Sequence, residues 1–449
     1  MSWALTDKLV LFELTDSIKI EFMADTLGLL FAVLITVVYL CNIIYSIAYM
    51  KDENNKKRYY IFYILLYFVL LSLSFSANLV TFYLFYELMT IVSVPLVFHE
   101  QTHEAVIASL KYLLYSMAGA YMVLAGIFFL RKYAITFDFI LGGVLKNNSD
   151  DTAGLMLIVL TLMIAGFSVK AGMFPMHSWL TLAHPVAPSP ASALLSGIIV
   201  KCGVFGILRT VFYIFGVDFI RGTWTQYLFL ILSLITVFMG SLLAFREEHI
   251  KKRLAYSTIS QVSYILFGIF MLDENAMTGS LLHIISHAFI KSALFMIAGI
   301  LIHQTGYTKA GDFKGVGKKM PLVMWCFTIC SLALTGIPPT GGFLSKWYLA
   351  TGAMSSKVAV FRYLGPVILL ISALLTAGYL FPVFMNGFFT DKEDKEAVGR
   401  YREGLCDPGL LFILPVMALT ALSVLAGMLP GPLIPFLKEL SSMMMGGMG

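Results

Sequence analysis

The feature that most constrains this chain is a succession of apolar segments, each about as long as a lipid bilayer is thick. A helix needs roughly 20 apolar residues to cross the hydrocarbon core, where it satisfies its own backbone hydrogen bonds. Hydrophobic residues make up 59% of the 449 residues and charged residues only 13%, a composition typical of membrane-embedded helices. The sequence predicts an all-α polytopic membrane protein with twelve transmembrane helices, at residues 24–49, 59–76, 79–98, 105–130, 153–175, 191–213, 225–245, 253–272, 277–303, 320–342 continuing into 343–354, 364–389 and 408–430.

A single membrane domain is expected, because no gap between these segments is long enough for a soluble domain. We expect this domain over residues 24–430, an N-terminal extracytoplasmic segment over 1–23 and a C-terminal tail over 431–449. The start of the chain is mixed polar and acidic, so we do not expect a cleavable signal peptide. Two charged runs, 51–58 and 391–403, are expected to be solvated, the second as an exposed linker.

The distribution of Lys and Arg predicts the orientation in the membrane. Loops after odd-numbered spans carry sixteen of the 31 basic residues, and the opposite side carries ten. This bias places the odd loops in the cytoplasm and both termini outside. The small net charge of +5 argues against a nucleic-acid partner. Five lysines remain within the predicted spans, namely Lys111, Lys170, Lys201, Lys291 and Lys346.

The stretch from Gly166 to Arg209 places two of these lysines, Lys170 and Lys201, in apolar helical surroundings. A lysine at the centre of a bilayer costs several kcal/mol, about 2.5–3.5 on insertion scales, so it needs a partner or a water-filled cavity. Pro175 removes a backbone donor shortly after the first lysine and breaks the helix there. These residues therefore indicate a functional site.

Two five-span units, 59–213 and 225–389, show a weak internal symmetry. The fourth span of each unit is interrupted, by Pro175 in the first and by Pro338 and Pro339 in the second, with a lysine close to each break. An odd number of spans makes the two units run in opposite senses across the membrane. Paired broken helices in inverted repeats are typical of transport sites.

Glu87 is the only acid in its span and lies near its middle. A buried carboxyl group without a nearby cation is expected to be neutral, because burial disfavours its charged form. We expect Lys170 to be the partner of Glu87. The alternative is a protonated Glu87 that hydrogen-bonds to the backbone.

The segment HIISHAFIK places His283, His287 and Lys291 at intervals of four residues, so all three lie on one helix face. Histidine and buried lysine can both exchange protons near neutral pH, which favours a proton relay. Structural hydrogen bonding and a metal site are the alternatives. A metal would need further ligands, and none follows at a clear spacing.

Other polar residues have weaker signals. Lys201 has small residues around it, which favour close packing and leave room for water, and Lys346 follows the second helix break. Lys111 either lines the cavity or extends to the membrane surface. His177 and His184 follow the first break, where they line the cavity or satisfy loop backbone. No phosphate loop, dinucleotide motif, cysteine cluster or nucleophile elbow occurs, so we expect no catalytic residue and no metal ligand in this chain.

Several blocks resemble signature segments of one family, that of the antiporter-like, proton-translocating membrane subunits of respiratory complex I, Mrp-type cation/proton antiporters and membrane-bound group 4 hydrogenases. The blocks are LFYELMTIVSVPL around Glu87, the stretch Gly166 to Arg209, KKRLAYSTISQVSYILFG, HIISHAFIKSALFMIAG and GIPPTGGFLSKWYL. The resemblance covers roughly residues 25–430.

The resemblance implies a set of roles. Glu87 would pair with Lys170, Lys201 would be the central relay residue, and Lys346 would connect to one side of the membrane. His283, His287 and Lys291 would continue the relay between them. The resemblance also implies a prokaryotic plasma membrane location, further antiporter-like subunits and a peripheral redox arm as partners, and no cofactor in this chain. Iron–sulfur, flavin or nickel–iron sites would lie only in partner subunits.

Two departures from the family pattern affect the expected function. The block that carries Glu87 comes early, which implies that an initial pair of helices is missing, and the position of Lys346 is lysine in some subunit types and glutamate in others. The run HPVAPSPASALLSG is more similar to hydrogenase-linked or formate-lyase-linked members. We expect a proton-translocating subunit of a redox-driven pump. The alternatives are a subunit of an Mrp-type Na⁺/H⁺ antiporter and a non-transporting membrane anchor for a redox arm.

Overall fold

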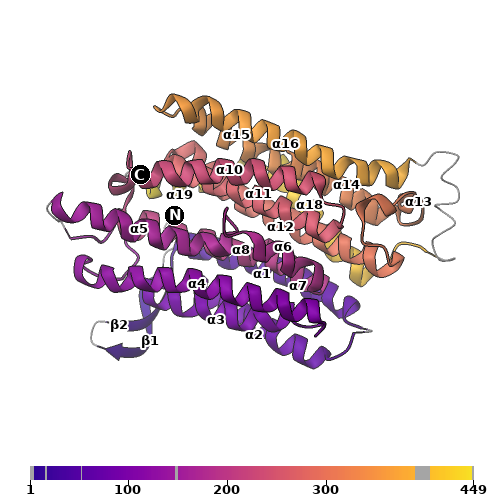
Figure 1. The fold of residues 1–449 in the computed structure, drawn as a ribbon, viewed down its shortest axis with the longest axis horizontal. Coiled ribbons are helices and arrows are strands. Elements are labelled where there is room, and N and C mark those ends of the chain that lie inside the picture. Colours follow the sequence, from indigo (N-terminus) through magenta and orange to yellow (C-terminus); the bar gives the residue numbers. More distant parts are fainter. Residues whose placement is uncertain (1–4, 16–17, 52, 147–149, 390–404, 447–449) are drawn as a thin grey trace.

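The computed structural model describes residues 5–15, 18–51, 53–146, 150–389 and 405–446. The helices lie side by side along a common direction, as expected for a membrane bundle (Figure 1). Helices of the first half of the chain lie along one side of the bundle in this view, and helices of the second half lie along the other.

The first half of the chain contains helices that the predicted spans anticipated to within a few residues at most ends. They are α1 (Thr26–Tyr49), α2 (Lys56–Ser74), α3 (Leu79–Val97), α4 (His103–Tyr133), α5 (Asp150–Ala171), α6 (Ser178–Val186), α7 (Ser189–Leu194), a π-helix η1 (Leu195–Ile199), α8 (Val200–Leu208) and a second π-helix η2 (Arg209–Phe215).

The second half of the chain also consists of helices and short turns. Its elements are α9 (Val217–Ile220), α10 (Trp224–Arg246), α11 (Ile250–Met271), α12 (Glu274–Thr305), the 3₁₀ turn η3 (Ala310–Asp312), α13 (Val316–Lys319), α14 (Pro321–Thr335), α15 (Gly341–Met354), α16 (Ala359–Phe388), α18 (Leu410–Met428) and α19 (Pro430–Met444).

The predicted all-α membrane fold is confirmed. Within the described ranges, eleven helical segments are long and apolar enough to cross a membrane, with the run from α7 to η2 counted as one segment. The predicted tenth span is formed by the shorter apolar helix α14 and by α15. Helix ends follow local signals: Asp25, Asn78 and Thr102 each cap a helix by accepting a hydrogen bond from a backbone N–H in its first turn.

Three central segments are buried on nearly all sides: the run Ser189–Phe215, α11 and α12. A helix that is apolar all round belongs in the interior, and small residues allow close contact with its neighbours. At Gly203 an added Cβ atom would lie 2.7 Å from both the Ala171 nitrogen and the Phe167 oxygen. This close approach holds α8 against the end of α5, next to Lys170.

Two helices end abruptly inside the bundle. α5 ends at Ala171, and Pro175 lies in the turn before α6 begins at Ser178. α14 ends at Thr335, and Gly336 adopts a φ of 93°, in the left-handed region that favours glycine. Pro338 and Pro339 lie in the turn between α14 and α15. Each break therefore frees backbone groups next to a lysine.

Both ends of the described chain contain structure that the sequence analysis did not predict. Within the expected 1–23 segment, β1 (Leu5–Thr15) and β2 (Ile18–Ala24) form an antiparallel hairpin. The Asn78 side chain donates to the Lys19 carbonyl at 2.9 Å and fixes the hairpin to α3. The expected tail begins within α19, whose apolar residues pack on the bundle. The predicted linker 391–403 lies outside the described residues.

Candidate functional site

Lys170 lies in the last turn of α5, buried at the first helix break. Its Nζ donates to Thr90 Oγ1 at 2.5 Å and lies 4.6 Å from the centre of the Tyr86 ring. Both partners come from α3, one helical turn apart, so they share the face that points at Lys170. A hydroxyl group and an aromatic face therefore stabilise the ammonium group.

Glu87 lies beside this contact but does not make it. It is half-buried, and its Oε1 atom is buried without a hydrogen-bond partner among the described residues. The direct Glu87–Lys170 ion pair expected from the sequence is not formed, although the two groups are close enough to interact electrostatically. Adjacent residues on a helix point about 100° apart, so the face that directs Tyr86 and Thr90 toward Lys170 turns Glu87 aside.

Lys201 lies in α8, buried at the centre of the bundle. Its Nζ donates to the Ser196 carbonyl at 2.6 Å. Ser196 belongs to η1, and a π-turn disrupts the regular helical hydrogen-bond ladder, so a carbonyl is free to accept the ammonium. The Ser196 hydroxyl meets Thr258 Oγ1 of α11 at 2.7 Å, which connects Lys201 to the second half of the chain.

His283 connects three helices. Its Nδ1 lies 2.8 Å from Ser345 Oγ of α15, and its Nε2 lies 3.1 Å from Gln261 Oε1 of α11. Its ring stacks on the His287 ring with 5.7 Å between centroids, one turn further along α12. The predicted alignment of these histidines on one helix face is therefore present.

His287 and Lys291 continue along the same face of α12. Both ring nitrogens of His287 are buried without a hydrogen-bond partner among the residues that the structure describes, an arrangement that is costly in a dry interior. Lys291 is buried, and its Nζ donates to the Leu254 carbonyl at 2.9 Å and to the Ser257 hydroxyl. Lys291 therefore joins α12 to α11.

Lys346 lies in α15 at the second helix break. Its Nζ donates to the carbonyls of Leu334 and Thr335 at 2.6 and 3.0 Å, in the last turn of α14. The carboxyl end of a helix carries partial negative charge, which stabilises a cation. The same ammonium lies 5.0 Å from the centre of the Tyr264 ring. We call the set Glu87, Lys170, Lys201, His283, His287, Lys291 and Lys346 the polar row.

The three weaker candidates occupy different environments. Lys111 is exposed on the outer face of α4, in keeping with extension to the membrane surface. His177 is half-buried and stacks near Phe174, with 6.0 Å between ring centroids. His184 is fully buried and stacks on Phe295 at 4.3 Å, and neither of its ring nitrogens has a partner within the described residues.

One buried ion pair was not predicted from the sequence. Arg209, at the end of the sixth predicted span, donates to both carboxylate oxygens of Asp25 at 2.6 Å each. Its guanidinium also lies 4.7 Å from the Phe139 ring centre and 4.6 Å from that of Tyr213. The count of basic residues assigns Arg209 to a loop. The only sequence signal is its position next to an apolar run, which does not distinguish a buried residue from an interfacial one.

The same count assigns Lys251 to a loop, but the structure places it in the first turn of α11. It is buried, and its Nζ donates to the Ala187 carbonyl at 3.0 Å. Glu100 lies just beyond the end of α3. Partial burial raises the pKa of Glu100, the charge of Lys251 opposes this shift and the neighbouring Glu53 adds to it. Charged groups therefore gather where this side of the bundle meets solvent.

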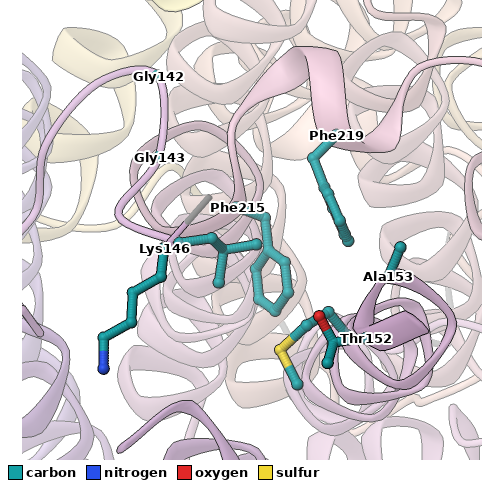
Figure 2. A pocket seen from close by; sticks show the side chains of 9 residues that line it. Gly142, Gly143, Lys146, Thr152, Ala153, Phe215 and Phe219 are labelled. Atoms are coloured by element: carbon teal, nitrogen blue, oxygen red, sulfur yellow. The ribbon is translucent and has the colours of Figure 1, made fainter. Parts of the chain in front are cut away.

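A separate cavity of about 390 Å³ lies between the loop before α5, the start of α5 and α9. Figure 2 shows Phe215 and Phe219 on its walls and the two glycines Gly142 and Gly143 on its rim. The Lys146 amine points away from the cavity and donates to the Lys132 carbonyl at 3.1 Å. This cavity lacks members of the polar row.

No metal centre is found in the described part of the chain, where no three His, Cys, Asp or Glu residues come together. The polar row consists of bases with a single carboxyl group at one end. This arrangement is chemically able to hold and pass protons, because lysine and histidine each exist in two protonation states.

Two family models match most of this chain. Residues 76–375 match the family model described as NADH:quinone oxidoreductase/Mrp antiporter, TM, and residues 13–60 match the model for the N-terminus of chain 5 of NADH-ubiquinone oxidoreductase (complex I). The N subunit of NADH-quinone oxidoreductase from Desulforudis audaxviator is 31% identical over 82% of this chain and 73% of its own length.

Relatives of two other kinds are similar to this chain. The D subunit of the Na(+)/H(+) antiporter from Alkalihalophilus pseudofirmus is 27% identical over 93% of this chain and 82% of its own. Hydrogenase-4 component B from Escherichia coli is 29% identical over 84% of this chain and 57% of its own.

Solved structures share the fold. A chain of the Mrp complex from Dietzia sp. has a TM-score of 0.84 at 20% identity, covering 98% of this chain and 88% of its own. A chain of respiratory complex I from Thermus thermophilus has a TM-score of 0.83 at 21% identity, covering 99% and 90%. With the family match spanning most of the bundle, the chain belongs to the NADH:quinone oxidoreductase/Mrp antiporter family of membrane subunits.

Proposed function

We propose that this chain is a proton-translocating membrane subunit of a multisubunit, redox-driven ion pump. The observation that carries the proposal is the polar row, in which buried and half-buried titratable groups from α3, α5, α8, α12 and α15 occur in one helical bundle and most of them contact hydroxyl or carbonyl groups of neighbouring helices. A charge at this depth is costly, so such a row is not expected in a membrane protein without a function.

The proposed mechanism starts at the Glu87 end. A conformational change in a neighbouring subunit alters the distance between Glu87 and Lys170. At 4 Å and an effective dielectric of about 20, an ion pair is worth about 4 kcal/mol. That energy is sufficient to shift the protonation equilibrium of a lysine by roughly a thousandfold, since about 1.4 kcal/mol corresponds to a factor of ten.

The proton that Lys170 releases then passes to Lys201. From there it continues to His287 and Lys291, whose unpartnered or hydroxyl-bonded groups are able to accept it. His283 and Ser345 form the connection toward Lys346. Water molecules would bridge the gaps, because buried polar groups without protein partners are the places where internal water binds.

The similar solved structures also support a proposal about partner subunits and cofactors. The similar solved structures are parts of an Mrp complex, an archaeal membrane-bound sulfane sulfur reductase and a complex I. We propose that this chain likewise sits among other membrane subunits and a redox arm. Electron-carrying cofactors would lie in those partners, and both termini would face the extracytoplasmic side of a bacterial-type membrane.

Replacing Lys201 with alanine tests this function. We expect Lys201→Ala to abolish coupled proton uptake in proteoliposomes that contain the complex, while co-purification of the partner subunits is retained. Unchanged uptake in this variant would refute the relay.

A component of a Na⁺/H⁺ antiporter is the second candidate function, because the antiporter relative from A. pseudofirmus matches 93% of this chain. Sodium prefers oxygen ligands, whereas the polar row holds one carboxyl group against four lysines, and this difference favours protons. A transport rate that depends on sodium at constant pH would reverse that preference.

A further inference from the structure

The seam between α11 and α16 holds buried polar side chains that lie outside the polar row. On α11, Arg253, Ser257 and Tyr264 recur at intervals of four and seven residues, so they share one helix face. Arg253 Nη1 donates to the Tyr379 carbonyl at 2.8 Å, and the Tyr264 hydroxyl donates to the Leu369 carbonyl at 2.7 Å. α11 and α16 therefore share a polar interface.

The Tyr379 hydroxyl occupies the middle of this seam. It donates to Thr376 Oγ1 at 3.3 Å, and the Ser257 hydroxyl lies close enough to interact with it. The Ser257 hydroxyl in turn accepts a hydrogen bond from Lys291 Nζ. Tyr379, Ser257 and Lys291 are all buried, so these three groups form a file of exchangeable protons inside the bundle.

Arg253 lies where this seam meets one face of the membrane domain, and it contacts Tyr379 through the backbone carbonyl and not through the hydroxyl. Arg253 is half-buried, and its Nε donates to the Glu247 carbonyl at 2.8 Å. The Glu247 carboxylate forms an ion pair with Lys252 at 3.1 Å, just before α11 enters the bundle. Arginine does not release its proton in proteins, so Arg253 acts as a positioning residue that holds Tyr379 and keeps the outer end polar.

We propose that Tyr379 and Ser257 form an access path for protons between Lys291 and the membrane face that carries Glu247 and Arg253. The path rests on the relay function proposed above and adds a connection to solvent in the middle of the polar row. The row then takes up its protons from solvent through this path.

Each transfer along this path conserves protons. A neutral Lys291 amine takes the proton of the Ser257 hydroxyl, Ser257 takes the proton of the Tyr379 hydroxyl, and Tyr379 takes a proton from a water molecule that has entered the seam from the membrane face. No bond between heavier atoms changes. The net result is one proton moved from solvent to Lys291, after which the two hydroxyl groups rotate back.

The test uses the full complex, purified through a tag on this chain and reconstituted into liposomes with an internal pH dye. A potassium gradient with valinomycin drives proton uptake. We expect Tyr379→Phe and Ser257→Ala each to slow uptake by roughly a hundredfold, the scale of a lost proton-transfer group. Ser257→Thr keeps a hydroxyl and should restore uptake to near the wild-type rate, which a purely structural role for Ser257 would not require.

The matched control is Tyr63→Phe. Tyr63 is also buried, and its hydroxyl donates to the Tyr39 carbonyl at 3.4 Å on α1, away from the seam. This variant should transport normally. If Ser257→Ala fails to assemble with its partners, Tyr379→Phe tests the access path alone. This substitution removes a single oxygen atom, and the Tyr379 side chain does not contact Lys291.

Two outcomes separate failure of this path from failure of the relay. Wild-type uptake in Tyr379→Phe and Ser257→Ala, together with a block in Lys201→Ala, would overturn the access path and leave the relay in place. Wild-type uptake in Lys201→Ala would overturn the proposed function itself.

Discussion

The two ends of the polar row place a lysine beside a helix break, but they stabilise its charge in different ways. Lys170 contacts a hydroxyl group and an aromatic face, and a carboxyl group without a partner at Oε1 lies nearby. Lys346 donates to two backbone carbonyls at the end of α14 and lies over a tyrosine ring. No carboxyl group forms an ion pair with Lys346 among the residues described.

This difference indicates different roles for the two ends. A side-chain carboxylate can move toward or away from a lysine, so the Lys170 end can be switched by a neighbouring subunit. Backbone carbonyls at a helix end are fixed in place, so the Lys346 end offers a constant site. A helix break with a lysine beside it therefore provides a switchable site at the Lys170 end of the polar row and a constant site at the Lys346 end.

The largest expected effect is at Lys170. We expect Lys170→Met to abolish coupled proton uptake, because Lys170 is the base that holds and releases the proton at the break after α5. Lys111→Met is the matched control, since Lys111 is an exposed lysine on the adjacent helix α4. Equal loss in both variants would mean that positive charge, and not the buried site, is what matters. Uptake in proteoliposomes measures both.

Glu87→Gln should have the next largest effect. Loss of the carboxylate removes an interaction worth up to about 4 kcal/mol when the pair forms, so we expect uptake to fall by roughly a hundredfold with assembly intact. The same measurement distinguishes the two ends of the row. A variant that pumps normally would show that the Lys170 end needs no counter-charge and works as the Lys346 end does.

Thr90→Val should have a smaller effect. It removes the hydroxyl that accepts from Lys170, and a hydrogen bond to a charged group is worth about 1.5–3 kcal/mol. We expect a roughly tenfold slower uptake, with Thr90→Ser close to wild type. If Thr90→Val and Thr90→Ser behave alike, the methyl group and not the hydroxyl supports Lys170.

Asp25→Asn tests a buried charge that is assigned no role in transport. Breaking a buried ion pair costs about 3–5 kcal/mol because one charge is left without its partner. We expect a lower midpoint of thermal unfolding for the purified complex, with the uptake rate per assembled complex unchanged. A specific loss of uptake at wild-type stability would place Arg209 and Asp25 in the transport path.

The fold was largely predictable because bilayer thickness fixes helix length. The broken helices followed from Pro175 and from Pro338 and Pro339, since proline cannot continue a backbone ladder. The N-terminal hairpin was not foreseen, because closely spaced charges obscured the alternation of its short strands. α19 was missed because it follows the last long apolar segment.

The site was predictable as a set of residues but not as a set of contacts. The intramembrane lysines stand out in the sequence because a charge within the bilayer costs free energy. The histidines of α12 stand out because their spacing places them on one helix face. The contact between Lys170 and Thr90 could not be predicted, because hydrophobicity does not reveal which face of α3 points inward. Likewise, the role of the Ser196 carbonyl depends on a π-turn for which the sequence carries no clear signal, and Arg209 lies too near a span end for its burial to be evident.

The most direct test of the central claim is a structure of the assembled complex at a resolution that shows ordered water. The proposed relay predicts a continuous file of water and side chains from Glu87 and Lys170 through Lys201 and His287 to Lys346, with water bound at both ring nitrogens of His287. Separate dry pockets around these residues, with no water between them, would contradict it.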